Sequence, residues 1–145
     1  MKICITALGS NLNSPIDPRF GRAQYFLFLD EKGELKESVL NPGGGAGRGA
    51  GVAAAQEIAN RGAEILITGN IGPNAFLVLS QTGIKVFLAP PGISAKEAFL
   101  LWKENRLNLV QAPTVPGHFG LGGGRGRRGG PPPGRGFGGP RRFGG

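Results

Sequence analysis

A sharp change in composition near residue 118 most constrains what this chain can fold into. Of the 28 residues at positions 118–145, 23 are glycine, arginine or proline. A segment of this composition cannot bury enough apolar surface to offset the backbone entropy lost on folding. We therefore expect a disordered basic tail over residues 118–145 and one folded domain over residues 1–117, which is long enough for a small core.

The net charge divides at the same boundary. Six of the 17 basic residues are arginines of the tail, whereas all 9 acidic residues lie in the expected domain. The high isoelectric point of about 10.6 therefore describes the tail, because the domain itself is nearly neutral. Any attraction to polyanions is expected to be local to the tail.

Cysteine usage and apolar runs exclude several classes of protein. The chain has a single cysteine, Cys4, so an internal disulfide and cysteine-based zinc sites are excluded. Cys4 lies in a strand-like run and is expected to be a buried, small apolar residue. The longest apolar runs, such as residues 25–29 and 98–102, have five residues and are too short to span a membrane. We expect a cytoplasmic protein without a membrane segment.

The pattern along the chain predicts an α/β fold with a mixed five-stranded sheet and three helices. A turn at residues 30–33 joins two apolar segments into a hairpin, and the other strands are parallel. The capping box from Ser94 to Glu97 opens the third helix, and Pro73 suits the first turn of the second. The expected strands are residues 2–6, 24–29, 34–40, 64–68 and 85–89, and the expected helices are residues 50–61, 73–80 and 94–104.

Three glycine-bearing loops, at residues 7–23, 43–51 and 69–74, are expected at the carboxyl ends of the parallel strands. This is where open α/β sheets bind ligands, and two of the loops lead into helix N-termini that favour anions. Three arginines lie in the first two loops, against one carboxylate, that of Asp17. This balance favours a bound anion and argues against a cage for a hard metal ion. The arginines are Arg19, Arg22 and Arg48.

Nucleotide fingerprints and catalytic groups are weakly represented. Residues 44–49 have the spacing of a phosphate loop, but Ala50 and Gly51 replace its lysine and hydroxyl residue. Residues 49–54 fit GxGxxA, yet no acidic residue closes the next strand, so dinucleotide binding remains only a weak alternative. The one histidine, His118, opens the tail, which leaves a nucleophile without a partner. We expect no catalysis.

Three segments in succession resemble the dinitrogenase iron-molybdenum cofactor biosynthesis family, whose small domains occur as nitrogenase cofactor carriers and accessory proteins. They are DPRFGRAQYF at residues 17–26, GGGAGRGAG at 43–51 and ITGNIGPNA at 67–75. The resemblance implies a ribonuclease H-like layered fold. It also implies non-covalent binding of the anionic iron-molybdenum cofactor or another metal–sulfur cluster, exchanged with donor and acceptor proteins of metallocluster assembly.

The resemblance places the binding residues in these segments. Nitrogenase carriers of this family often have a histidine before Phe-Gly, where this chain has Arg19. A guanidinium cannot ligate a metal, whereas it can donate hydrogen bonds to sulfide and oxo groups. Binding through charge and backbone N–H groups is therefore expected. The expected binding residues are Arg19, Phe20, Gly21, Arg22, Gly45, Gly47, Arg48, Gly49, Gly69, Asn70, Gly72 and Asn74.

The tail supports a rival hypothesis. Its Arg-Gly segments resemble those of RNA-binding proteins, in which cations neutralise phosphates and phenylalanines stack on bases. The tail has only three phenylalanines, at positions 119, 137 and 143. A nucleic-acid-binding protein acting through the tail is thus the alternative function, and an acidic partner protein is an equal candidate for the six arginines.

Overall fold

The structure is a computed structural model that describes residues 1–41 and 49–113. Six strands in these residues form one sheet in the order β3-β2-β1-β4-β5-β6. The strands are β1 (Ile3–Ala7), β2 (Tyr25–Leu29), β3 (Leu35–Leu40), β4 (Ile65–Thr68), β5 (Lys85–Leu88) and β6 (Asn108–Leu109). The helices are α1 (Ala50–Asn60), α2 (Pro73–Gln81) and α3 (Ala95–Lys103).

The sheet is parallel in its centre and antiparallel on both sides. Strands β1, β4 and β5 run parallel, while β2 and β3 form the expected hairpin beside β1. The mixed α/β class is confirmed, but the prediction of five strands was wrong. The sixth strand, β6, pairs with β5 through two residues only, which is too short to produce a periodic sequence pattern.

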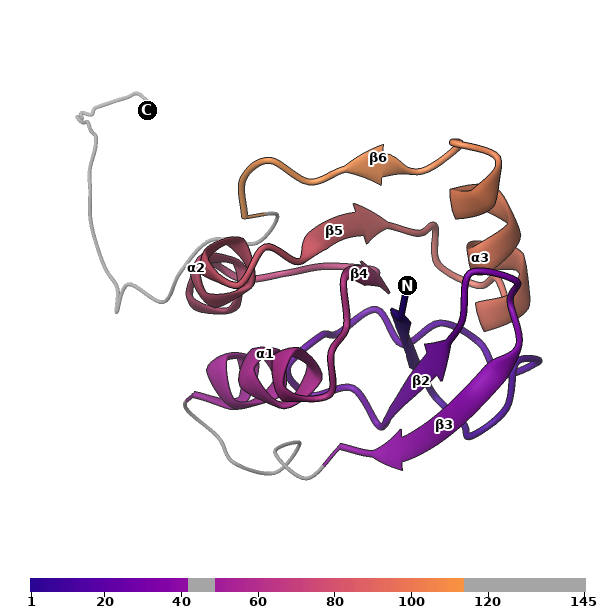
Figure 1. The fold of residues 1–145 in the computed structure, drawn as a ribbon, viewed down its shortest axis with the longest axis horizontal. Coiled ribbons are helices and arrows are strands. Elements are labelled where there is room, and N and C mark those ends of the chain that lie inside the picture. The colour runs from indigo at the N-terminus through magenta and orange to yellow at the C-terminus, as the bar shows by residue number, and fades with distance from the viewer. Residues whose placement is uncertain (42–48, 114–145) are drawn as a thin grey trace, which may run out of the picture. The chain divides into compact units, whose positions relative to one another are not determined.

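Alternating side chains give the sheet two buried faces, and helices cover both (Figure 1). Cys4 and Phe28 face the layer formed by α1 and α2, whereas Ile3 and Ile5 face the side that holds α3. Every residue of β1 is buried, as expected for a central strand with both faces covered. The core therefore lies in two layers on either side of β1 and β4.

Small residues allow α1 and α2 to pack closely together. The buried side of α1 consists of Ala50, Ala54, Ala55 and Ile58. A Cβ atom at Gly51 would lie 3.2 Å from the Cβ of Ala75, so Gly51 lets the first turns of the two helices approach. The two helices consequently begin side by side at one end of the sheet (Figure 1).

None of the helices formed by residues 1–41 and 49–113 is both long enough and apolar enough to cross a membrane.

Candidate functional site

The loop at residues 8–24 crosses the carboxyl ends of β1 and β4. The Thr6 hydroxyl, at the end of β1, donates a 2.8 Å hydrogen bond to the carbonyl of Asp17. The hydroxyl oxygens of Thr6 and Thr68 lie 2.9 Å apart, so the ends of β1 and β4 are joined beneath the loop. All three residues are fully buried. These contacts fix the loop at the edge where the sequence predicts the site.

The Asp17 carboxylate organises the rest of this loop from within the domain. Its Oδ1 accepts hydrogen bonds of 3.1 Å from both the backbone N–H and the Nε of Arg19. Its Oδ2 accepts from Nη2 of Arg19 at 3.1 Å and from the backbone N–H of Gln24 at 3.0 Å. The hydrogen bond and the charge of Asp17 raise the pKa of the Arg19 guanidinium above its ordinary value.

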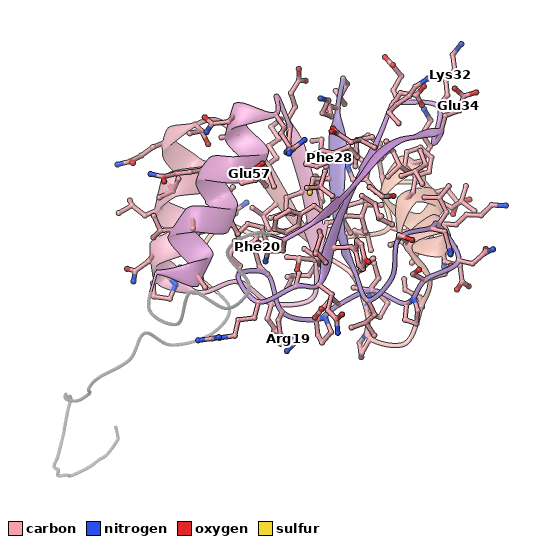
Figure 2. All side chains as sticks on the ribbon, turned by 90° about the horizontal axis from the view of Figure 1, so that it is seen from below. Arg19, Phe20, Phe28, Lys32, Glu34 and Glu57 are labelled. Atoms are coloured by element: carbon pink, nitrogen blue, oxygen red, sulfur yellow. The ribbon has the colours of Figure 1, made fainter. Side chains whose placement is uncertain are left out.

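The two arginines of the loop differ in their surroundings. Arg19 points away from the domain near the end where α1 begins, with its side chain 53% exposed (Figure 2). Arg22 is exposed, and its side chain forms no ion pair or hydrogen bond with other described residues. The charge of Arg19 is therefore compensated by Asp17, whereas the charge of Arg22 is not.

Phe20 lies between the two arginines in the sequence but points into the core (Figure 2). It is 3% exposed, and its ring centroid lies 6.0 Å from that of Phe26. Of the residues expected to bind, Phe20 thus has its side chain in the core. It anchors the loop while its neighbours stay outside.

Two glycines allow the predicted loops to meet. A Cβ atom at Gly21 would lie 2.6 Å from the backbone nitrogen of Gly51, in the first turn of α1. A Cβ atom at Gly69 would lie 2.6 Å from the Cα of Pro18. Both distances are too short for any side chain, and in both cases the opposing atoms belong to the backbone. The loop at residues 17–24 therefore packs against the start of α1 and against the segment that leads to α2.

Among the described residues, no side chain caps the N-terminus of α1 or of α2. The residue that precedes α1 is Gly49, in the left-handed conformation (φ 81°), and the one that precedes α2 is Gly72. Neither first turn contains an acidic residue. Within the described residues, the backbone N–H groups of residues 50–52, 74 and 75 have no acceptor. Such N–H groups, together with the positive end of the helix dipole, attract anions.

The remaining predicted residues have different placements. Asn74 is exposed in the first turn of α2. Gly69 and Asn70 line a hollow of about 170 Å³ beside this edge, together with Ile16, Pro18, Ala89 and Pro91. Gly45, Gly47 and Arg48 lie outside the described residues, as does the whole tail on which the nucleic-acid hypothesis depends.

The described residues offer no thiol and no group of carboxylates that could bind a metal at this edge. Cys4 is fully buried in β1, and burial raises the pKa of its thiol far above the ordinary range. Its prediction as a buried residue is confirmed. Among residues 1–41 and 49–113, no three His, Cys, Asp or Glu side chains are grouped so that they could hold a metal ion.

Two residues that hold the site loop in place through hydrogen bonds were not predicted from the sequence. Asp17 is fully buried, and the side chain of Asn41 donates to the carbonyls of Gly21 and Ala23 at 3.0 and 2.9 Å. A local signal did exist for Asp17, because an aspartate two residues before an arginine can accept the N–H of that arginine in an Asx turn. The hydrogen bonds of Asn41 span about 20 residues and left no such signal.

Comparison with known proteins identifies relatives of this domain. Residues 1–105 match the model of the family described as dinitrogenase iron-molybdenum cofactor. An uncharacterized protein of Methanocaldococcus jannaschii is 37% identical over 102 residues, which cover 68% of this chain and 86% of the relative.

Two solved structures share both the fold and part of the sequence. The apo form of the orange protein from Desulfovibrio gigas has a TM-score of 0.75 and 35% identity, over 79% of this chain and 96% of that one. A Thermotoga protein with a NifB assignment has a TM-score of 0.69 and 33% identity, over 79% and 97% of the two chains.

Proposed function

The chain belongs to the dinitrogenase iron-molybdenum cofactor family, and from this premise we propose that it is a small accessory or carrier protein for an anionic metal–sulfur cluster. The cluster, the iron-molybdenum cofactor or another, is a cargo that the domain holds without covalent bonds and without catalysing a reaction. One observation carries the proposal. Two helix N-termini that no described side chain caps, and the arginine-bearing loop, pack against one another at one edge of the sheet.

The donors at this edge fit an anion held by hydrogen bonds. Guanidinium groups and backbone N–H groups donate to sulfide and oxo groups but supply no lone pair to a metal. The proposed contacts come from the exposed loop and from the first turns of α1 and α2, with Phe20 as the inward anchor. They are Arg19, Gly21, Arg22, Gly49, Gly69, Asn70, Gly72 and Asn74, and the contacts from Gly45, Gly47 and Arg48 remain predictions.

The relatives support a role in cluster metabolism. One of them is an orange protein with an apo form, which implies a form that carries a bound group. Another carries the name of a NifB protein. We infer that this domain exchanges its cluster with donor and acceptor proteins in the cytoplasm. The order β3-β2-β1-β4-β5, with three antiparallel strands followed by two parallel ones, supports a ribonuclease H-like designation for the domain.

The proposed function is tested by the metal content of the native protein. The full chain is purified anaerobically from its own host and analysed for Mo, Fe, Cu and acid-labile sulfide. We expect one of these metals together with sulfide in a fixed ratio to protein, and a visible absorption band that co-elutes on gel filtration. Protein that reproducibly carries neither metal nor sulfide would contradict the proposal.

A further inference from the structure

We propose that Asp17 is a positioning residue of this site. It holds Arg19 in one orientation, so that the cargo meets aimed N–H donors instead of a freely moving cation. This inference rests on the proposed function and deepens it. Its starting point is a fully buried carboxylate in a loop that is otherwise largely polar and exposed.

The carboxylate of Asp17 is saturated by its neighbours. Each of its two oxygens accepts two hydrogen bonds, one from the Arg19 side chain and one from a backbone N–H group. A carboxylate offers about four acceptor positions, so Asp17 has none left for a ligand, a metal ion or a proton in transfer. Its role is therefore exerted through Arg19.

The pair fixes Arg19 while leaving part of it available. Nε and Nη2 of Arg19 both donate to Asp17 at 3.1 Å, one to each oxygen. This two-point contact fixes the plane of the guanidinium as well as its distance. A guanidinium has five N–H donors, so three remain for the cargo on a side chain that is half exposed.

The ion pair with Asp17 also makes the two arginines differ in charge compensation. Because Asp17 compensates the charge of Arg19, the uncompensated charge of the described loop belongs to Arg22. The remaining donors of Arg19 are thereby presented in fixed directions, which suits a cargo anion that accepts two or more hydrogen bonds at once.

A double-mutant cycle tests this inference on the full chain, with tetrathiomolybdate as the probe. We expect Asp17→Asn and Arg19→Gln each to weaken binding about tenfold, the size typical of one charged hydrogen bond. We expect the double variant to bind no more weakly than Arg19→Gln alone, because Asp17 acts through Arg19. Losses that add to about a hundredfold would overturn the inference, since Asp17 would then act independently of Arg19.

Two further measurements distinguish a positioning role of Asp17 from a general loss of loop structure. Arg19→Lys retains the charge and loses the two-point contact, so we expect it to bind tetrathiomolybdate as weakly as Arg19→Gln. Wild-type affinity in Arg19→Lys would overturn the inference even if Asp17→Asn failed to fold. The thermal midpoint of Arg19→Lys should stay at the wild-type value, because the side chain is half exposed. A fall in the midpoint that accompanies the loss of binding would point to general damage of the loop and against a positioning role.

The matched control is Asp30→Asn. Asp30 also accepts two backbone N–H groups, at 2.9 Å from Lys32 and Glu34, and lies near a lysine. Its turn is at the opposite end of the domain from Arg19 (Figure 2). We expect wild-type affinity in this variant. Wild-type protein that binds no tetrathiomolybdate would count against the proposed function, whereas binding with additive losses would count against this inference alone.

Discussion

The start of α3 differs from the starts of α1 and α2 in how the first backbone N–H groups find acceptors. The first four N–H groups of a helix have no acceptor within the helix. In α3, Ala95 and Lys96 donate at 2.9 Å to the carbonyls of Ser14 and Leu12, and the N–H of Glu97 donates to the Ser94 hydroxyl at 3.1 Å. The Glu97 carboxylate in turn accepts from the backbone N–H of Ser94.

Helices α1 and α2 begin after glycines, and within residues 1–41 and 49–113 they have neither a side-chain cap nor an acidic residue in the first turn. A helix whose N-terminus is satisfied by the protein has no need of a ligand, whereas the starts of α1 and α2 keep backbone donors that have no acceptor in the part of the chain described. The start of α3 therefore serves the stability of the fold. We assign the starts of α1 and α2 to binding.

The largest expected effect on binding comes from separating the loops that meet at this edge. Gly69→Ala places a Cβ atom against the backbone of Pro18, so the loop must shift. We expect tetrathiomolybdate affinity to fall about tenfold or more and the free energy of unfolding to fall by about 1–3 kcal/mol. Calorimetric titration and thermal unfolding measure the two effects.

The control for this substitution is Gly62→Ala. Gly62 has a positive φ of 85° and open space around it, after the end of α1. Backbone strain should lower stability by about 1 kcal/mol without a change in affinity. Equal losses of affinity in both variants would show that the close contact between Gly69 and Pro18 is not specifically required for binding.

The second-largest effect is expected when the start of α2 receives a side-chain cap like that of α3. The backbone at Gly72 is extended (φ −86°, ψ 171°), which suits an aspartate cap. We expect Gly72→Asp to raise the free energy of unfolding by about 0.5–1 kcal/mol and to weaken thioanion binding several-fold, because the new carboxylate occupies the donors and repels the ligand. An unchanged affinity would show that the start of α2 is not part of the site.

The converse change removes the cap of α3. Ser94→Ala should lower the free energy of unfolding by about 1 kcal/mol. Since its donors serve the fold, tetrathiomolybdate affinity should stay at the wild-type value. Titration and thermal unfolding of the same samples check both statements, and a drop in affinity would break the contrast between the helices.

The smallest effect on binding is expected at Cys4, which lies beneath the helices and not at their ends. Burial raises the pKa of the Cys4 thiol, so the folded protein keeps the proton where the unfolded chain loses it above about pH 8.5. The unfolded state then binds fewer protons, and this thiol makes stability fall as the pH rises further. Cys4→Ala should retain binding and show a shallower alkaline loss of stability, measured by denaturant unfolding from pH 8 to 10. If a folded Cys4→Ala variant lost binding, the Cys4 thiol would have to be assigned to the binding site.

Local patterns in the sequence predicted most of the fold. The strand expected at residues 2–6, the helix expected at residues 50–61 and the capping box at Ser94 all depend on neighbouring residues, and all three are confirmed. Strand β6 escaped because Asn108 and Leu109 alone form it, held by tertiary pairing with β5.

The candidate site could be located from the sequence but not resolved into roles. The positions of the glycine loops at one edge of the sheet followed from chain order. The burial of Phe20 and the exposure of Arg19, in contrast, depend on how the loop turns. The burial of Asp17 could not be foreseen, since a carboxylate in a polar loop is ordinarily exposed. Its burial requires partners from Arg19 and Gln24 together, which only the folded loop supplies.

The most direct test of the central claim is a map of backbone amide shifts as tetrathiomolybdate, a diamagnetic anion, is added anaerobically to the 15N-labelled full chain. We expect saturable changes at residues 49–52, at residues 74 and 75, and at Arg19 and Arg22. We expect none at residues 95–97, where the carbonyls of Ser14 and Leu12 and the Ser94 hydroxyl accept the N–H groups of α3. Changes centred on the start of α3, or confined to residues 118–145, would contradict this assignment of the site.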